Sequence, residues 1–310
     1  MLRLALFPVI AREFFGKQTL PREPEPDLVM LDEEQVRAYS LAGRIDGVMS
    51  AAYLFHSGQA SSVIHGARLV IDLGCGPATQ LAQIAALNPD SEFVGIDLSP
   101  AMLDSARRHV AACGLKNVSF LHGDITRLSQ FDNQTVDAVI STMVLHHLPT
   151  REHLAACFSE ISRVLKPGGA VYLTDFGRLK SLYSVIRIAY MNADQQPHIF
   201  SLDYERSLRA AFLYKEFEET ARQCLPTSVR AYSTLIAPLL IILRTAPRTL
   251  PEDIRVRLDR FRMELPKRYR RDFEDLRLFL RLGGLTPDPF HTTARTRRQR
   301  RDVDGNERSA

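Results

Sequence analysis

The hydrophobic positions of this 310-residue chain form short runs separated by longer amphipathic stretches from residue 68 onward. Five of these runs are rich in β-branched residues and alternate with helical patterns, at 68–74, 92–98, 118–124, 136–142 and 170–176. Such alternation is typical of βαβ units. The runs lack strict apolar–polar alternation, which indicates strands buried on both faces, as in a parallel sheet. Two further runs complete a predicted α/β sheet of seven strands, at 229–235 and 239–245.

The helices between these runs have well-marked ends. Ser99 followed by Pro100 is an N-cap and first-turn pair, and Gly114 is placed to close the same helix. Another helix is expected at about 150–165, where Lys-Pro-Gly-Gly ends the pattern. Acidic residues from Asp32 onward suit the first turn of a helix, so helices are predicted before the first strand.

The segments outside the sheet are predicted to be additions to one main domain. The proline-rich residues 1–30 favour an extended arm, and the main domain is expected to span 31–246. Within it, the irregular segment 178–207 is rich in Tyr and Ile and is interpreted as a cap insertion. Residues 247–285 are predicted to form a charged helical extension, and 286–310 a disordered basic tail.

Charge and cysteine content narrow the class of protein. The formal net charge is +4, and residues 247–310 hold 17 of the 40 Lys and Arg but 11 of the 36 Asp and Glu. The rest of the chain is nearly neutral, so no DNA partner is expected. The four cysteines fit neither a zinc site nor a disulfide scaffold. Pro8 interrupts the N-terminal apolar stretch, and we expect a cytoplasmic protein without a signal peptide or membrane span.

The clearest chemical signal is the segment VIDLGCGPAT at 70–79, a predicted strand that enters a glycine turn and then a helix. Small residues allow a ligand to approach the backbone, and the helix presents free N–H groups. A nicotinamide fingerprint needs a third glycine where Thr79 stands, which weighs against a dehydrogenase. Asp72, Asp97 and Asp124 end three successive strands. Ligands bind at the carboxyl ends of such strands, so these aspartates are predicted to converge on one crevice.

Five segments carry a family resemblance: VIDLGCGPAT, FVGIDLSPAML, FLHGDITRL, VDAVISTMVLHHLP and LKPGGAVYLTDF. In this order and spacing, residues 31–246 resemble the class I S-adenosylmethionine-dependent methyltransferases, and among them the small-molecule, UbiE-type enzymes. The resemblance implies a Rossmann-like, doubly wound sheet, mostly parallel with the last strand antiparallel, and S-adenosyl-L-methionine as cofactor. Ala78 stands where the family has its third glycine, a mild change.

The same resemblance assigns the cofactor-binding residues. It implies that Asp72, Gly74, Cys75 and Gly76 border the methionine moiety, that Asp97 and Leu98 lie at the ribose, that Asp124 and Ile125 face the adenine, and that Ser141 lies beside the amino acid end.

The residues acting on the acceptor are less clear from the sequence. His146 and His147 follow the fourth predicted strand and are candidates for a general base and a substrate contact, with local packing or capping as the alternative. Adjacent side chains on a helix point in different directions, so we do not expect both to serve one reacting atom. Their spacing predicts no metal site. Aromatic residues of the cap and the N-terminal region are candidate acceptor contacts, with core or surface positions as the alternative: Tyr39, Tyr183, Tyr190, His198 and Tyr204.

The resemblance implies a methyltransferase that works by in-line displacement. The aromatic cap and the non-basic core predict that its acceptor is a small, apolar or aromatic metabolite. Such a reaction requires mainly alignment and desolvation from the protein. Two alternatives stay open: an RNA- or protein-modifying methyltransferase that uses the Arg-rich C-terminus, or a non-catalytic cofactor-binding partner protein.

Overall fold

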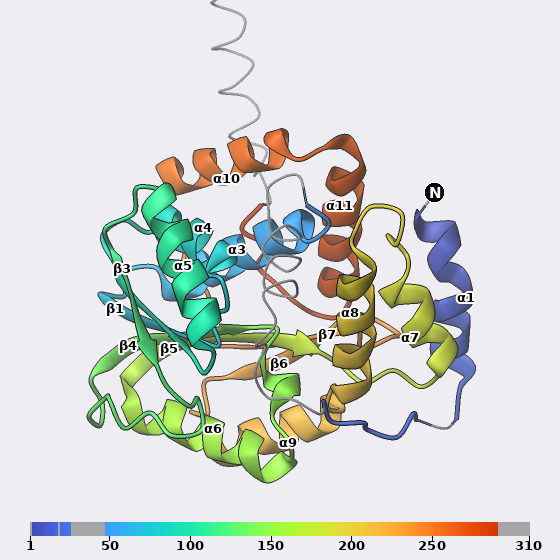
Figure 1. Ribbon diagram of the computed structural model, residues 1–310, viewed down its shortest axis with the longest axis horizontal. Helices are drawn as coiled ribbons and strands as arrows, with labels where there is room; N and C mark the ends of the chain where they lie inside the picture. Colours follow the sequence, from blue (N-terminus) through green and yellow to red (C-terminus); the bar gives the residue numbers. More distant parts are fainter. Residues whose placement is uncertain (1, 18, 26–46, 291–310) are drawn as a thin grey trace, which may run out of the picture.

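The computed structural model describes residues 2–17, 19–25 and 47–290, and its centre is a seven-stranded sheet (Figure 1). The strands in chain order are β1 (Leu69–Leu73), β2 (Glu92–Asp97), β3 (Val118–His122), β4 (Val136–Thr142), β5 (Leu165–Phe176), β6 (Arg230–Ser233) and β7 (Leu240–Arg244). Their spatial order is β3-β2-β1-β4-β5-β7-β6. Every neighbouring pair is parallel except the two pairs made by β7. The structure therefore confirms the Rossmann-like, doubly wound sheet and its antiparallel last strand.

Helices cover both faces of the sheet (Figure 1). On one face lie α3 (Ser50–Ile64), α4 (Thr79–Leu87), α5 (Pro100–Ala112), α10 (Glu252–Glu264) and α11 (Lys267–Leu282), and on the other lie α6 (Arg151–Val164) and α9 (Tyr214–Cys224). Successive strand residues alternate between the two layers: Val70 packs in the first hydrophobic cluster and Ile71 in the second. The strands β1, β4 and β7 are thus buried on both sides, as the continuous apolar runs predicted, whereas the edge strand β3 is largely exposed, contrary to that expectation. The carboxyl-end loops are left to form a site.

The predicted helix ends are confirmed where the sequence marked them. The Ser99 hydroxyl accepts a hydrogen bond from the Met102 amide at the start of α5, and Gly114 follows the helix with a φ of 68°. A left-handed residue after the last turn is how many helices end, and glycine adopts it without steric cost. The Ser99 cap fixes the start of α5 at Pro100, shortly after Asp97 at the end of β2.

The N-terminal region differs from the extended arm that the sequence predicted. Residues Leu2–Phe15 form the helix α1 with Pro8 inside it. Tertiary contacts explain the difference: Val9 is buried against the cap, and the buried Glu13 carboxylate accepts hydrogen bonds from the Lys180 amide at 2.9 and 3.2 Å. Packing outweighs the local preference of a proline-containing segment. After α1, residues 19–25 run back to the sheet, and we call them the strap.

The cap and the C-terminal region also depart from expectation. The segment expected to be irregular contains two helices, α7 (Leu182–Ala189) and α8 (His198–Ala210). Disorder expected from residue 286 is contradicted for 286–290, because Phe290 is buried and its ring packs edge-on against Phe273 at 4.8 Å. Residues 291–310 lie outside the described part. Within the described residues, we find no helix of the length and apolar character needed to cross a bilayer.

Candidate functional site

The glycine turn after β1 is held open at the carboxyl edge of the sheet. The amides of Gly74 and Cys75 donate to the Ile96 carbonyl at 2.8 and 3.0 Å, which ties the turn to β2. Gly74 has a φ of 69°, and a Cβ there would lie 2.2 Å from a methyl of Val144. Gly76 has a φ of 52°, and a Cβ there would meet nothing within 4 Å. Open space therefore adjoins the backbone at Gly76, as a ligand cradle requires.

The buried Asp72 and the half-buried Asp97 flank this turn. Asp97 accepts hydrogen bonds from the Gly76 and Ser99 amides, both at 2.8 Å. Burial raises the pKa of Asp97, although these amide contacts oppose the rise. Burial raises the pKa of Asp72 well above its ordinary value, and the charge of Asp97 adds to it. Because desolvated acids are stabilised in their ionised form by a nearby cation, the pair suits a positively charged ligand.

The other predicted cofactor residues lie at the same edge but differ in exposure. Asp124 accepts from the amide and the hydroxyl of Thr126, both at 2.8 Å, and remains exposed beside the half-buried Ile125. Leu98 is exposed next to Asp97. Ser141 is fully buried, and its hydroxyl donates to the Leu73 carbonyl at 2.9 Å. Ser141 therefore supports the end of β1, and its hydroxyl is already engaged by the backbone.

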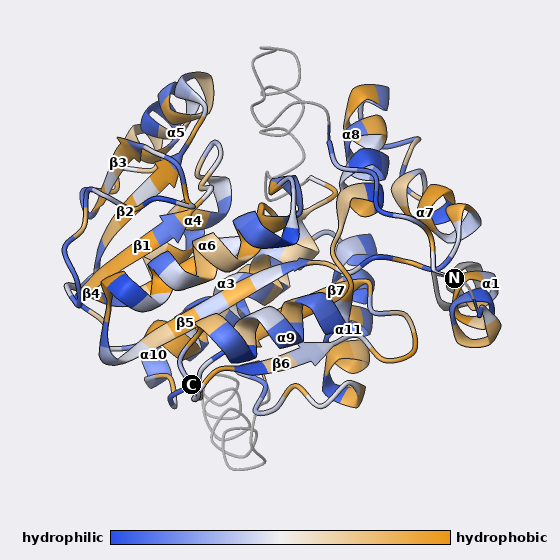
Figure 2. Cartoon of the chain, turned by 90° about the horizontal axis from the view of Figure 1, so that it is seen from below, coloured by the Kyte–Doolittle hydropathy of each residue, from blue (hydrophilic) through white to orange (hydrophobic). Residues whose placement is uncertain are grey.

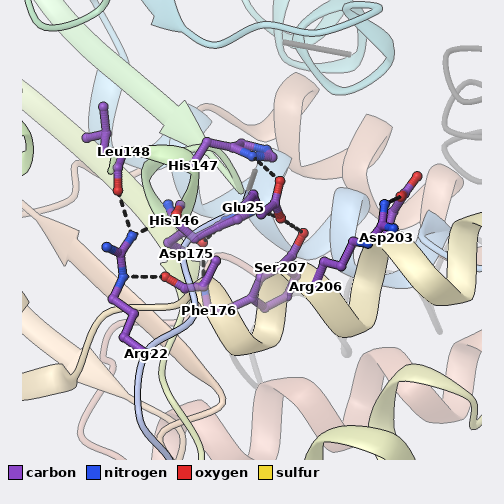
Figure 3. Close-up of polar contacts among 11 residues, drawn as sticks. Arg22, Glu25, His146, His147, Leu148, Asp175, Phe176, Asp203, Arg206 and Ser207 are labelled. Atoms are coloured by element: carbon purple, nitrogen blue, oxygen red, sulfur yellow. Dashed lines mark hydrogen bonds and ion pairs between the residues drawn. The ribbon is translucent and has the colours of Figure 1, made fainter. Parts of the chain in front are cut away.

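His146 lies in the short helix η1 (Leu145–His147) after β4 and forms a buried pair with Asp175 at the end of β5 (Figure 3). Its Nδ1 is 2.6 Å from Asp175 Oδ1, and its backbone amide donates to Asp175 Oδ2 at 2.8 Å. Burial lowers the pKa of His146, but the charge of Asp175 and its hydrogen bond outweigh burial, and the pKa is raised. In the neutral ring Nδ1 carries the proton toward Asp175, which leaves Nε2 as an acceptor.

His147 faces the strap, where Glu25 contacts both histidines. Its Nδ1 is 2.7 Å from Glu25 Oε2, and His146 Nε2 is 3.9 Å from Glu25 Oε1. The Ser207 hydroxyl donates to Glu25 Oε1 at 2.9 Å. Burial would raise the pKa of Glu25, but the hydrogen bond from His147 and the histidine charges lower it to about 2. The charge of His147 also lowers the pKa of Asp97, so this cluster lies within electrostatic reach of the cofactor edge.

The expectation that the two histidines diverge is wrong. Their ring centroids lie 4.2 Å apart, because η1 is a single tight turn and both rings meet the strap. Glu25, His146 and His147 bring three potential metal-ligand atoms within 4.8 Å of one another. Two of these atoms, Glu25 Oε2 and His147 Nδ1, already contact each other at 2.7 Å.

Arg22 of the strap holds the η1 loop in place (Figure 3). Its guanidinium donates to the carbonyls of His146, Leu148 and Pro149 at 3.1, 2.6 and 2.5 Å, and its Nε donates to the Ala210 carbonyl at 2.7 Å. The planar fork of arginine suits such multiple contacts. The strap thereby fixes the position of the loop that carries both histidines.

A small cavity of about 30 Å³ opens beside this cluster. It is lined by Met49, His146, His147, Phe176, Phe200, Asp203, Tyr204 and Ser207. Of the predicted acceptor contacts, Tyr204 lines it and stacks on Phe176 at 5.2 Å. Tyr190 and His198 pair with each other at 6.0 Å outside the lining, and Tyr183 is exposed on α7. Tyr39 lies outside the described residues.

Sequence reasoning missed several residues of this cluster. Asp175 could have been found, because it ends the fifth strand just as the three predicted aspartates end theirs. Arg22 and Glu25 carried no such signal, since their segment looked like a proline-rich linker.

Comparisons with known proteins agree with this geometry. Residues 70–169 match the family model described as a methyltransferase domain. An arsenite methyltransferase of Halobacterium salinarum is 36% identical over 107 residues, covering 34% of this chain and 26% of that protein. A demethylmenaquinone methyltransferase of Bacillus cytotoxicus is 35% identical over 102 residues, covering 33% and 41%. The chain thus spans less than half the length of these relatives.

Among solved structures, the PH0226 protein of Pyrococcus horikoshii superposes with a TM-score of 0.50 at 19% identity, covering 70% of this chain and all of that one. This likeness supports the fold. The family match spans the segment that holds the glycine turn, the three aspartates and both histidines.

Proposed function

We propose that this chain, whose residues 70–169 match the model of a methyltransferase domain, transfers the methyl group of S-adenosylmethionine to a small apolar or aromatic metabolite. The observation that carries the proposal is the convergence of Asp72, the open turn at Gly76 and Asp97 on one edge of the sheet. The turn lacks the third glycine of a dehydrogenase fingerprint, since Thr79 stands at that position.

The cofactor suits the charge and shape of this edge. When bound, S-adenosylmethionine supplies a methyl group already activated by a sulfonium, and it carries an ammonium as well. Asp72 and Asp97 would favour both positive charges, because burial has made their own ionisation costly. Asp97 also offers acceptor oxygens for a ribose diol, while the exposed Asp124 and Ile125 can meet the adenine.

The acceptor side is supported by the cavity next to His146. Phe176, Phe200 and Tyr204 make its wall aromatic, which favours an apolar or aromatic acceptor. In this proposal His146 Nε2 takes the acceptor's proton, and Asp175 positions the ring as the nearby carboxylate of a base. His147 contacts the acceptor side of the crevice and is held by Glu25. The cavity is small, so an acceptor must displace side chains of α8 on entry.

Calorimetry with S-adenosylhomocysteine tests the cofactor assignment. Asp97→Ala removes charge-assisted acceptors worth about 1.5 to 3 kcal/mol each, so affinity should fall on the order of tenfold to a hundredfold or more. Asp104→Ala is the matched control, because Asp104 is an exposed acid on α5 that pairs with Arg107. A folded Asp97→Ala protein that binds as tightly as the parent, or a parent that binds NAD instead, would overturn the assignment.

The acceptor class needs a separate assay. Labelled methyl transfer from S-adenosylmethionine into the small-molecule, RNA and protein fractions of a cell extract should place the label in the small-molecule fraction. Label in RNA that declines steeply as salt rises would indicate phosphate contacts and refute a small-molecule acceptor.

A further inference from the structure

The helices α1 and α7 lie side by side at the end of the molecule opposite β3 (Figures 1 and 2). Both helices carry large apolar side chains that are exposed. We call this surface the α1–α7 patch; its apolar members are Phe7, Phe14, Phe15, Leu182, Tyr183 and Ile186. Phe7, Phe14 and Phe15 are 63% to 76% exposed. Within the described residues, these six make up almost half of the large hydrophobic side chains that stand exposed. Such a concentration marks an interaction surface more often than scattered single residues do.

The patch is not an unpacked core face. Each helix has a separate inward side: Val9 and Glu13 point to the protein from α1, and Val185 and Ile188 do so from α7. The outward side chains are therefore not needed to pack either helix against the protein. Arg12 covers the ring of Tyr183 at 4.9 Å, which joins the two helices across the surface.

The exposed charges within residues 7–17 and 180–189 that adjoin the patch share one sign. Arg12, Lys17 and Arg187 are exposed on or beside the two helices. The one acid of residues 7–17, Glu13, is buried and bound to the Lys180 amide, and residues 180–189 contain no acid. A second copy of this chain would bring like charges together across a twofold contact, which disfavours self-association through the patch. Aromatic side chains among arginine and lysine match an anionic lipid surface instead.

We propose that the α1–α7 patch docks on the surface of an anionic lipid bilayer, with the phenylalanines inserted at the headgroup level and the cations among the lipid phosphates. This binding does not depend on methyl transfer. The patch is connected to the site along the chain in two places. The strap leads from α1 to Glu25, and α7 follows Asp175 and Phe176 within a few residues. Docking would hold the acceptor cavity close to a lipid phase in which apolar acceptors dissolve.

Vesicle sedimentation of the full chain tests the proposal. Vesicles of phosphatidylcholine mixed with phosphatidylglycerol are compared with phosphatidylcholine alone, at low and at high salt. The parent protein should bind the mixed vesicles, and salt should weaken binding because it screens the cations. Phe14→Ser combined with Phe15→Ser should weaken binding at least about tenfold, since both rings lose the gain from leaving water. Arg187→Glu should weaken it about fivefold or more.

Val256→Ser combined with Met263→Ser is the matched control, because both side chains are exposed on α10, away from the patch. This control should bind like the parent. The Arg-rich residues 291–310 are the same in every protein tested, so they cannot produce a difference between variants. Absence of parent binding to the mixed vesicles, or equal binding by the Phe14/Phe15 variant, overturns the proposal. A concentration-dependent dimer that the Phe14/Phe15 variant loses would identify the patch as a protein interface and also overturn it.

Discussion

Glu25 gives the sharpest test of how the strap stabilises the site. Its pKa is lowered from 4.5 to about 2 in the folded protein, chiefly by the hydrogen bond from His147 working against burial. At about 1.4 kcal/mol for each pKa unit, this corresponds to about 3 kcal/mol of folding free energy. Because the folded pKa is the lower one, the contribution is present above pH 4.5 and is lost as pH falls through about 2. Glu25→Gln keeps the shape of the side chain and removes this contribution.

Urea unfolding followed by circular dichroism, at pH values on both sides of 4.5, measures the effect. Glu25→Gln should lower the unfolding free energy by about 3 kcal/mol above pH 4.5, and the difference from the parent should shrink as the pH is lowered. Glu23→Gln is the matched control in the same strap, because Glu23 is 52% exposed and pairs with Arg209 on the surface. It should cost about 1 kcal/mol or less. A loss for Glu25→Gln that matches the control, or does not change with pH, would refute the reasoning.

Two further predictions concern the site. Asp175→Asn should lower kcat/KM about a hundredfold. The acidic limb of the profile of kcat/KM against pH should also move to lower pH, because Asp175 raises the pKa of His146 and only the neutral ring accepts a proton. An unchanged pH profile would exclude His146 as the base. Gly74→Ala should destabilise the fold by about 2 to 5 kcal/mol in thermal unfolding, since its Cβ meets Val144, whereas Gly76→Ala should cost about 1 to 2 kcal/mol and mainly weaken cofactor binding. Equal losses in both alanine variants would contradict the close packing at Gly74.

Most of the central sheet could be predicted from sequence because its signals are local. A buried strand shows as a short apolar run, and α5 is bounded by a Ser-Pro start and a glycine end that lie within 16 residues. Parallel strands share one carboxyl edge, so the pattern of strands along the chain is enough to place Asp72, Asp97 and Asp124 at that edge. Only the geometry of a βαβ unit is needed for that inference.

The periphery and the acceptor side were decided by contacts between distant parts of the chain. Residues 19–25 have the composition of a linker, yet Arg22 binds the carbonyl of His146, which is 124 residues away. Phe290 likewise is buried through contacts that include the ring of Phe273, from the preceding helix α11. No window of sequence contains both members of such a pair. The sequence by itself determined the sheet and the carboxyl edge at which the aspartates lie, because periodicity and caps act over a few residues. Tertiary structure decided that the strap pairs Glu25 with the histidines, because that contact exists only once the sheet and cap have been assembled.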